Sequence, residues 1–439
     1  MTLRRVAVNS SWWISEKAAL LLTSLATSIV LVRLLGAAGY GSLSYLLAVV
    51  GLLAPLAQFG ISGLVARALL ERPDQERAIL GTAFVLRLLG AVIALLAGLL
   101  YWLYAEDASA ERAVLLVLLL AQLASSLQVV EFWFQARLKA GALAPWRTGV
   151  MLVAALAKML VAWQTHSATA VAWVFAAEYL AIGFTQLAAY ARASGKSLRP
   201  QLARPWLGWF AGRAPWLLLS GLAEIIYLRI DIVMLERMRG LHDTGIYAVA
   251  SRLSEIWYAV PAMLAASMFP VLWERRHDSQ AYSRSLQTAL DSLVVPAFVL
   301  AILVQLLAGP LIELLFGAQF AASAAVLRVH IWAGLFIFMR ALLSRWLIAE
   351  DLLRFSLVTH LSGAVLNVSL NLLLIPAHGP MGAAIATVIS YAVAGWLALF
   401  FAAPTRPMAV MMTKSLLLPL RFDALRAYRA RLARRGGAE

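Results

Sequence analysis

Long apolar segments recur along the whole chain, and short polar stretches separate them. A helix needs roughly 20 apolar residues to cross the hydrocarbon core of a bilayer. Helices are favoured over strands because each backbone polar group in lipid must be bonded within its own segment. The pattern predicts an all-α, polytopic bundle of about twelve transmembrane helices near residues 11–34, 40–65, 78–104, 113–135, 147–165, 168–190, 207–235, 244–270, 286–309, 322–348, 355–375 and 380–402.

The composition agrees with a protein that is dissolved in lipid. The chain is 62% hydrophobic and 13% charged, whereas a soluble domain carries about 25% charged residues. Its mean hydropathy is +0.82. The 439 residues include no cysteine, which excludes disulfides, thiolate metal ligands and a thiol nucleophile.

The positive charges are distributed as a membrane topology requires. The net charge of +15 comes from short basic runs between apolar segments, a distribution that does not indicate nucleic-acid binding. If the amino terminus is cytoplasmic, the predicted outer loops hold only Arg112, Arg237 and Arg239. Cytoplasmic loops are enriched in Lys and Arg. We therefore expect both termini in the cytoplasm, with the first apolar run retained as a span because no small-residue cleavage site follows it.

An internal repeat divides the chain into two halves. A shift of 204 positions places Trp12 on Trp216, Gly36 on Gly240 and Gly41 on Gly245. An even number of spans in each half makes the halves parallel repeats, related by a pseudo-two-fold axis along the membrane normal. The predicted units are a six-helix lobe over 1–195, a second six-helix lobe over 196–403 and a basic cytoplasmic tail over 404–439. The tail suits either an interfacial segment held by anionic lipids or a solvated topology anchor.

Ionisable side chains interrupt several of the predicted spans. Such residues are costly at membrane depth and usually face a bundle interior or a wet cavity. The seventh span carries Arg213, Ser220, Glu224, Tyr227 and Asp231 at steps of 7, 4, 3 and 4, so they lie on one helix face. Arginine binds phosphate oxygens, and Tyr and Ser suit hydroxyls. The predicted substrate-binding residues are Lys17, Arg87, Arg213, Arg252, Arg328, Arg340, Tyr227 and Tyr247.

Other roles stay open for these charges. Each arginine has the alternative of pairing with a buried carboxylate that holds helices together, as Arg252 with Glu224. Lys158 and Glu178 lie at similar predicted depths, which favours a structural ion pair. Burial disfavours the charged form of a carboxyl group, so some acids are candidates for ion coupling, namely Glu178, Glu224, Asp231 and Glu255. His330 and His360 are predicted packing residues, since no metal-site spacing surrounds them.

Several motifs resemble those of one transporter family. The eleventh and twelfth spans carry Asn367, Asn371, a turn from Pro376 to Gly379, and a small-residue helix start at Gly382. Other similar segments are Asp231 to Tyr247 with Phe269-Pro270, and Arg33-Leu-Leu-Gly36 with Gly39-Tyr40-Gly41. The segment Glu131-Phe-Trp133-Phe134-Gln135 resembles a signature in which Gly is usual where this chain has Ala136. Together these motifs resemble the oligosaccharide flippase family, within the superfamily that also holds multidrug and toxin extruders.

The resemblance implies a function as well as a MATE-like fold. It implies a polyprenyl-diphosphate-linked oligosaccharide repeat unit as substrate, flipped across a bacterial inner membrane by alternating access with an ion gradient as energy source. It implies no cofactor and no catalytic residue, with membrane lipids and a polysaccharide polymerase as candidate partners. The positions nearest to the family's cationic lumen are Lys17, Arg87, Arg213 and Arg252.

Competing functions predict different features. A multidrug extruder of the same superfamily is expected to line its cavity with acidic and aromatic residues, whereas cations modestly exceed acids inside these spans. A lipid II flippase typically carries two further spans. A membrane-embedded polymerase or ligase needs a large outer loop, and no predicted loop is long enough. The sequence therefore favours the flippase and keeps the extruder as its alternative.

Overall fold

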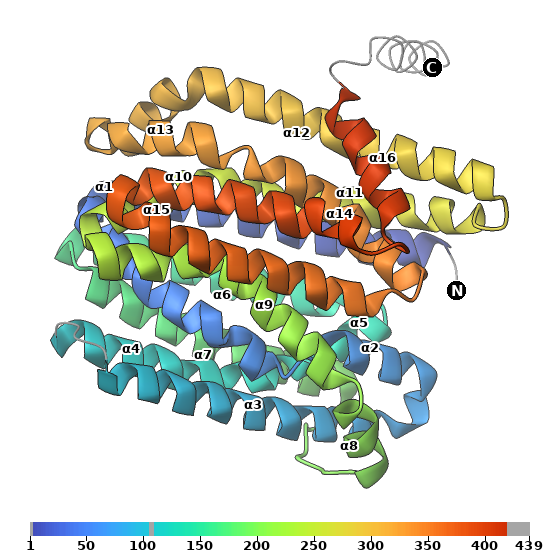
Figure 1. The fold of residues 1–439 in the computed structure, drawn as a ribbon. Helices are drawn as coiled ribbons and strands as arrows, with labels where there is room; N and C mark the ends of the chain where they lie inside the picture. Colours follow the sequence, from blue (N-terminus) through green and yellow to red (C-terminus); the bar gives the residue numbers. More distant parts are fainter. Residues whose placement is uncertain (1–2, 105–108, 419–439) are drawn as a thin grey trace.

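The computed structural model describes residues 3–104 and 109–418, which form helices and contain no strand (Figure 1). The first half holds α1 (Leu3–Gln58), α2 (Ser62–Glu71), α3 (Glu76–Tyr104), α4 (Ser109–Ala121), α5 (Glu131–Ala136), α6 (Ala140–Thr165) and α7 (Ala168–Ser194). The second half holds α8 (Arg204–Ala211), α9 (Ala214–Arg239), α10 (Leu241–Glu255), α11 (Ala259–Glu274), α12 (Ser279–Phe316), α13 (Ala321–His330), α14 (Ala333–Ala349), α15 (Leu353–Gly395) and α16 (Arg406–Leu416). The short 3-10 helices η1 (Pro73–Gln75), η2 (Gln122–Val130), η3 (Ile256–Tyr258), η4 (Ala318–Phe320) and η5 (Leu397–Phe401) connect them.

The apolar helices make this a multi-pass membrane protein. Seven helical segments of the described chain are long and apolar enough to cross a bilayer, and an eighth is the pair Ala318–His330 and Ala333–Ala349, bent by 45°. The segment Ser11–Glu71 has 61 residues, about 90 Å of helix at 1.5 Å per residue, so it exceeds one crossing. It turns back at Gly36, and α15 turns back at Gly379 (Figure 1). Helices occupy every predicted span, and the number twelve stays a prediction.

Several predicted spans are divided in the structure, and the division of the seventh span changes the position of a predicted site residue. The predicted span 207–235 splits into α8, which ends at Ala211, and α9, which begins at Ala214 with Pro215 in its first turn. Proline is well placed in a first turn because its missing N–H would be unpaired there anyway. Arg213 therefore precedes α9 and does not belong to the predicted helical stripe.

The internal repeat is confirmed by the backbone at two glycines. Gly36 has φ 69° and ψ −178°, and Gly240 has φ 84° and ψ 178°, a conformation that glycine adopts without a steric penalty. The next pair of matched glycines meets across the molecule. A Cβ on Gly41 would lie 1.9 Å from the Leu241 carbonyl oxygen, and one on Gly245 would lie 1.9 Å from that of Ala37. The shift of 204 positions converts Gly41 into Gly245 and Ala37 into Leu241, so each contact is the counterpart of the other. A pseudo-two-fold axis requires this correspondence.

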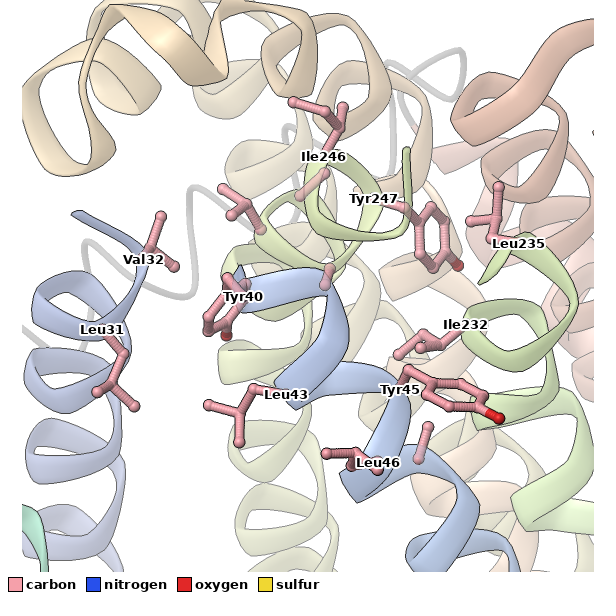
Figure 2. Close-up of a cluster of buried hydrophobic side chains, with 14 of the residues drawn as sticks. Leu31, Val32, Tyr40, Leu43, Tyr45, Leu46, Ile232, Leu235, Ile246 and Tyr247 are labelled. Carbon is pink, nitrogen blue, oxygen red and sulfur yellow. The ribbon is translucent and has the colours of Figure 1, made fainter. Parts of the chain in front are cut away.

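The bundle has two lobes that meet along α1, α9 and α10. The segment of α1 after Gly36 packs against both α9 and α10. Figure 2 shows Tyr40, Leu43 and Leu46 of this segment together with Ile232 of α9 and Ile246 of α10. The apolar core therefore continues from one lobe into the other. The lobe limits 1–195 and 196–403 stay predictions.

The start of the predicted tail packs on the second lobe. In α16, the side chains of Met408 and Met412 are buried in the core formed with α12 and α14. The Ser415 hydroxyl donates to the Asp291 carboxylate at 2.6 Å and accepts from the Gln287 amide at 2.8 Å. The apolar face of this part of the segment 404–439 is thus covered by protein, and its position relative to the bilayer stays a prediction. Residues 419–439 of the predicted tail lie outside the described residues.

Candidate functional site

A polar cavity of about 360 Å³ lies between the two lobes. Both segments of α1, together with α6 and α7, form its wall on one side, and α9 and α10 form the other. Its charged lining residues are Lys158, Glu178, Arg229 and Arg252, and its hydroxyl-bearing residues are Thr23, Ser24, Thr27, Ser28, Tyr40, Ser44 and Ser251. Three cations against one carboxylate give this wall a positive bias.

The hydroxyl groups on α1 are compatible with a helix in lipid. Thr27 donates to the Thr23 carbonyl at 2.7 Å, and Ser28 donates to the Ser24 carbonyl at 2.8 Å. Such bonds to the carbonyl four residues earlier satisfy the hydroxyl within its own helix. The sequence therefore produces a polar stripe on α1 without interrupting the helix, and this stripe faces the cavity.

Arg252 connects the two lobes across the cavity. Its Nε donates to the Ser28 hydroxyl at 3.2 Å, and its Nη2 donates to the Ser24 hydroxyl. Within the described part of the chain, its bonding partners are these hydroxyls on α1, and no carboxylate forms an ion pair with it. The alternative pairing with Glu224 is not seen. Arg252 is thus a cation on the cavity wall whose hydrogen-bond partners, among the described residues, are neutral.

The other two cations of the cavity are paired. The Lys158 ammonium lies 2.5 Å from the Glu178 carboxylate and 3.6 Å from the centre of the Phe175 ring, which confirms the predicted ion pair. Arg229 lies 2.9 Å from the Glu255 carboxylate. Sequence reasoning missed Arg229, although a cation in the middle of the seventh span was itself a sufficient signal.

Most predicted substrate-binding residues lie away from this cavity. Arg87 faces a second cavity inside the first lobe. Arg340 is buried in the second lobe, where it donates to the Thr359 hydroxyl at 2.9 Å and the Ala394 carbonyl at 2.7 Å. Arg213 lies 4.7 Å from the centre of the Trp209 ring, and the side chains of Lys17 and Arg328 are exposed. Hydropathy indicates the depth of a residue but not the direction in which its helix face points.

The remaining predicted residues form contacts inside the second lobe. The Tyr227 hydroxyl and the His360 Nδ1 are 3.0 Å apart. Asp231 is buried and accepts hydrogen bonds from the Tyr247 hydroxyl, from the Thr387 hydroxyl at 3.2 Å and from the backbone N–H of Ile232 at 2.8 Å. Of the four predicted coupling acids, Glu178 and Glu255 thus pair with cations, whereas Asp231 is held by neutral donors.

Polar contacts hold the lobes together at the end that carries Gly36 and Gly240. Arg237 of α9 donates to the hydroxyls of Tyr45 and Tyr101 in the first lobe, at 2.7 and 2.8 Å. Arg33 of α1 donates to the carbonyls of Leu315 and Leu314 at the end of α12, at 2.8 and 2.5 Å. We call these two arginines with their partners the lobe latch. The latch therefore joins the lobes near the ends of α1 and α9.

Solved structures of two transporters share this fold. An inward-facing multidrug resistance MATE transporter matches with a TM-score of 0.68 and 14% identity, over 90% of this chain and 96% of the other. The lipid II flippase MurJ in an inward closed conformation matches with a TM-score of 0.68 and 15% identity, over 94% of this chain and 91% of the other. The chain therefore has the two-lobe, MATE-like fold that its repeat and its motifs predict.

Sequence comparisons give the family. A curated relative from Haloferax volcanii, named "Probable low-salt glycan biosynthesis flippase Agl15", is 25% identical over 179 residues, which are 40% of this chain and 37% of that protein. The chain thus matches well under half the length of that relative. The model of the family described as "Polysaccharide biosynthesis protein" matches residues 30–326. This match covers more than half of the sequence, and the chain therefore belongs to the polysaccharide biosynthesis protein family.

Proposed function

We propose that the protein is a flippase that moves a polyprenyl-diphosphate-linked oligosaccharide across the bacterial inner membrane by alternating access. The family, the curated flippase relative and the fold shared with a lipid II flippase support this proposal. The chamber between the lobes supports it independently, because its wall carries more cationic than acidic side chains. A cationic wall suits an anionic cargo such as a diphosphate.

The observation that carries the proposal is that Arg252 lies on the cavity wall without a carboxylate partner among the described residues. Its guanidinium lies on the cavity wall and donates to two serine hydroxyls. A guanidinium binds phosphate oxygens through two parallel N–H···O bonds between opposite charges, which a neutral hydroxyl cannot match. A diphosphate in the cavity would therefore replace the Ser24 and Ser28 hydroxyls as the partner of Arg252.

This exchange of partners would couple cargo binding to lobe movement. Arg252 belongs to α10 and its hydroxyl partners belong to α1, so their hydrogen bonds cross between the lobes. Cargo that takes over the guanidinium removes these hydrogen bonds between α1 and α10. The free energy of binding is then available to shift the equilibrium between two arrangements of the lobes, since a ligand shifts an equilibrium only by its differential affinity for the two states.

Asp231 is our proposed residue for ion coupling. Its carboxylate lies among α9, α10 and α15, where Tyr247 and Thr387 bond to it. An ionised carboxylate with neutral donors is costly at membrane depth. A proton or a sodium ion that binds there lowers this cost and would change the packing of three helices at once.

Reconstitution with a fluorescent lipid-linked oligosaccharide tests the flippase proposal. The wild-type protein should bring the lipid to the opposite leaflet, as measured by its accessibility to a membrane-impermeant quencher. Arg252→Gln should slow this appearance about tenfold or more, because a hydrogen bond to a charged group contributes about 1.5–3 kcal/mol.

Arg284→Gln is the matched control, since Arg284 is an exposed residue of α12 that contacts Gln280. This variant should flip at the wild-type rate. Full activity of Arg252→Gln would contradict the cationic-lining proposal. Transport of a cationic dye without any flipping of the lipid would instead support the multidrug extruder.

A further inference from the structure

A second polar cavity, of about 280 Å³, lies inside the first lobe. Residues 50–58 of α1 line it, together with side chains of α3, η2, α5 and α7. It adjoins the cavity between the lobes, whose wall includes residues 40–48 of α1. On α7 the neighbouring residues Glu178 and Tyr179 line the first and the second cavity respectively.

Polar atoms without partners face this second cavity. The Arg87 side chain is 5% exposed, and its Nε has no hydrogen-bond partner. No hydrogen bond or ion pair joins Arg87 to another described residue. Gln122 Oε1 and Ser125 Oγ are likewise buried without a partner. Unsatisfied buried polar groups are rare and costly, so their convergence on one cavity indicates a ligand.

The carboxylate that shares this cavity with Arg87 forms its ion pair with a different arginine. Glu131 lines the same cavity, but it forms an ion pair with Arg147 at 3.1 Å, and Arg147 also binds Glu16 at 2.9 Å. Lys17, next to Glu16 in the chain, is exposed and forms no ion pair with another described residue. Because Glu131 is bonded to Arg147, the guanidinium of Arg87 keeps its N–H groups available for an anionic ligand.

The unpaired atoms also specify hydrogen-bonding groups on that ligand. Arg87 can only donate, so the ligand must carry an acceptor, and a carboxylate fits the guanidinium best. Gln122 Oε1 can only accept, so the ligand must also carry a donor. A halide has no donor and would leave this atom unsatisfied. A hydroxylated carboxylate satisfies both, with the Phe132 ring on the same wall for its apolar face.

The volume of the cavity suits a ligand as small as one sugar ring. Pockets for drug-sized ligands measure roughly 300–1,000 Å³, and this cavity lies just below that range. We propose that it binds a single acidic sugar, a hexuronate unit of the cargo, with the sugar carboxylate on Arg87. This inference rests on the proposed transport of a glycan. The site would make transport specific for one sugar of the cargo, while the diphosphate occupies the adjoining cavity at Arg252.

Binding of free sugars to the full chain in lipid nanodiscs tests the proposal. Saturation-transfer difference NMR with D-glucuronate and D-glucose compares two rings that differ by the carboxylate. The wild-type protein should bind D-glucuronate about tenfold or more tightly than D-glucose, which is the effect expected for one hydrogen-bonded charge. Arg87→Gln should bring the affinity for D-glucuronate down to that for D-glucose.

Two further variants keep the test decisive. Ser125→Ala retains the charge of Arg87 and should weaken both sugars alike, and Arg284→Gln should bind as the wild type does. Equal binding of the two sugars by the wild type, or unchanged selectivity in Arg87→Gln, would overturn the proposal. Tighter binding of inorganic phosphate than of D-glucuronate would overturn the assignment to a sugar. The assay involves no transport, so its failure is distinguishable from a failure of the flippase proposal.

Discussion

Asp231 shows how the partners of a single buried side chain point to a role. Its carboxylate is bonded to hydroxyls of α10 and α15, whereas Glu178 and Glu255 are bonded to cations. A proton or sodium gradient should therefore act through Asp231. In proteoliposomes, an imposed gradient should accelerate flipping by the wild type, and Asp231→Asn should flip at one rate with or without it. Continued acceleration in Asp231→Asn, with Arg284→Gln as the responsive control, would disprove this role.

The packing of two elements, α1 and α10, depends on glycine at their crossing. A methyl group on Gly41 would lie 1.9 Å from a carbonyl oxygen of the partner helix, and one on Gly245 would meet the same obstacle by symmetry. Gly41→Ala and Gly245→Ala should each lower the free energy of unfolding by about 1–3 kcal/mol, as overpacking does. Gly149→Ala in α6, where no atom lies within 4 Å, should not. Unchanged thermal unfolding of both crossing variants would contradict the structure at this contact.

The helices themselves were predictable from the sequence, but their rotations were not. Apolar windows located the long apolar helices, and Gly36 and Gly240 marked the repeat, because lipid imposes long apolar runs and a positive φ selects glycine. The face that each helix presents depends on its neighbours, which hydropathy does not describe. Arg87 and Arg340 were therefore assigned to one chamber, whereas they lie inside separate lobes. Arg229 was overlooked because the stripe on its own helix pointed elsewhere.

At the scale of the whole molecule, the proposed alternating access would require the lobe latch to open. Arg237 donates to Tyr45 and Tyr101 across the lobes. Replacing it removes charge-assisted bonds between the lobes at the end of the bundle that carries Gly36 and Gly240. Because the chain has no cysteine, spin labels at Gln164→Cys in α6 and Gln319→Cys in η4 report the separation of the lobes without interference. Arg237→Ala should shift the distances measured by electron–electron double resonance to longer values. Arg239→Ala is the control, since Arg239 pairs with Asp243 inside its own lobe. This variant should leave the distances unchanged. The same distance distribution in both variants would show that Arg237 does not hold the lobes together.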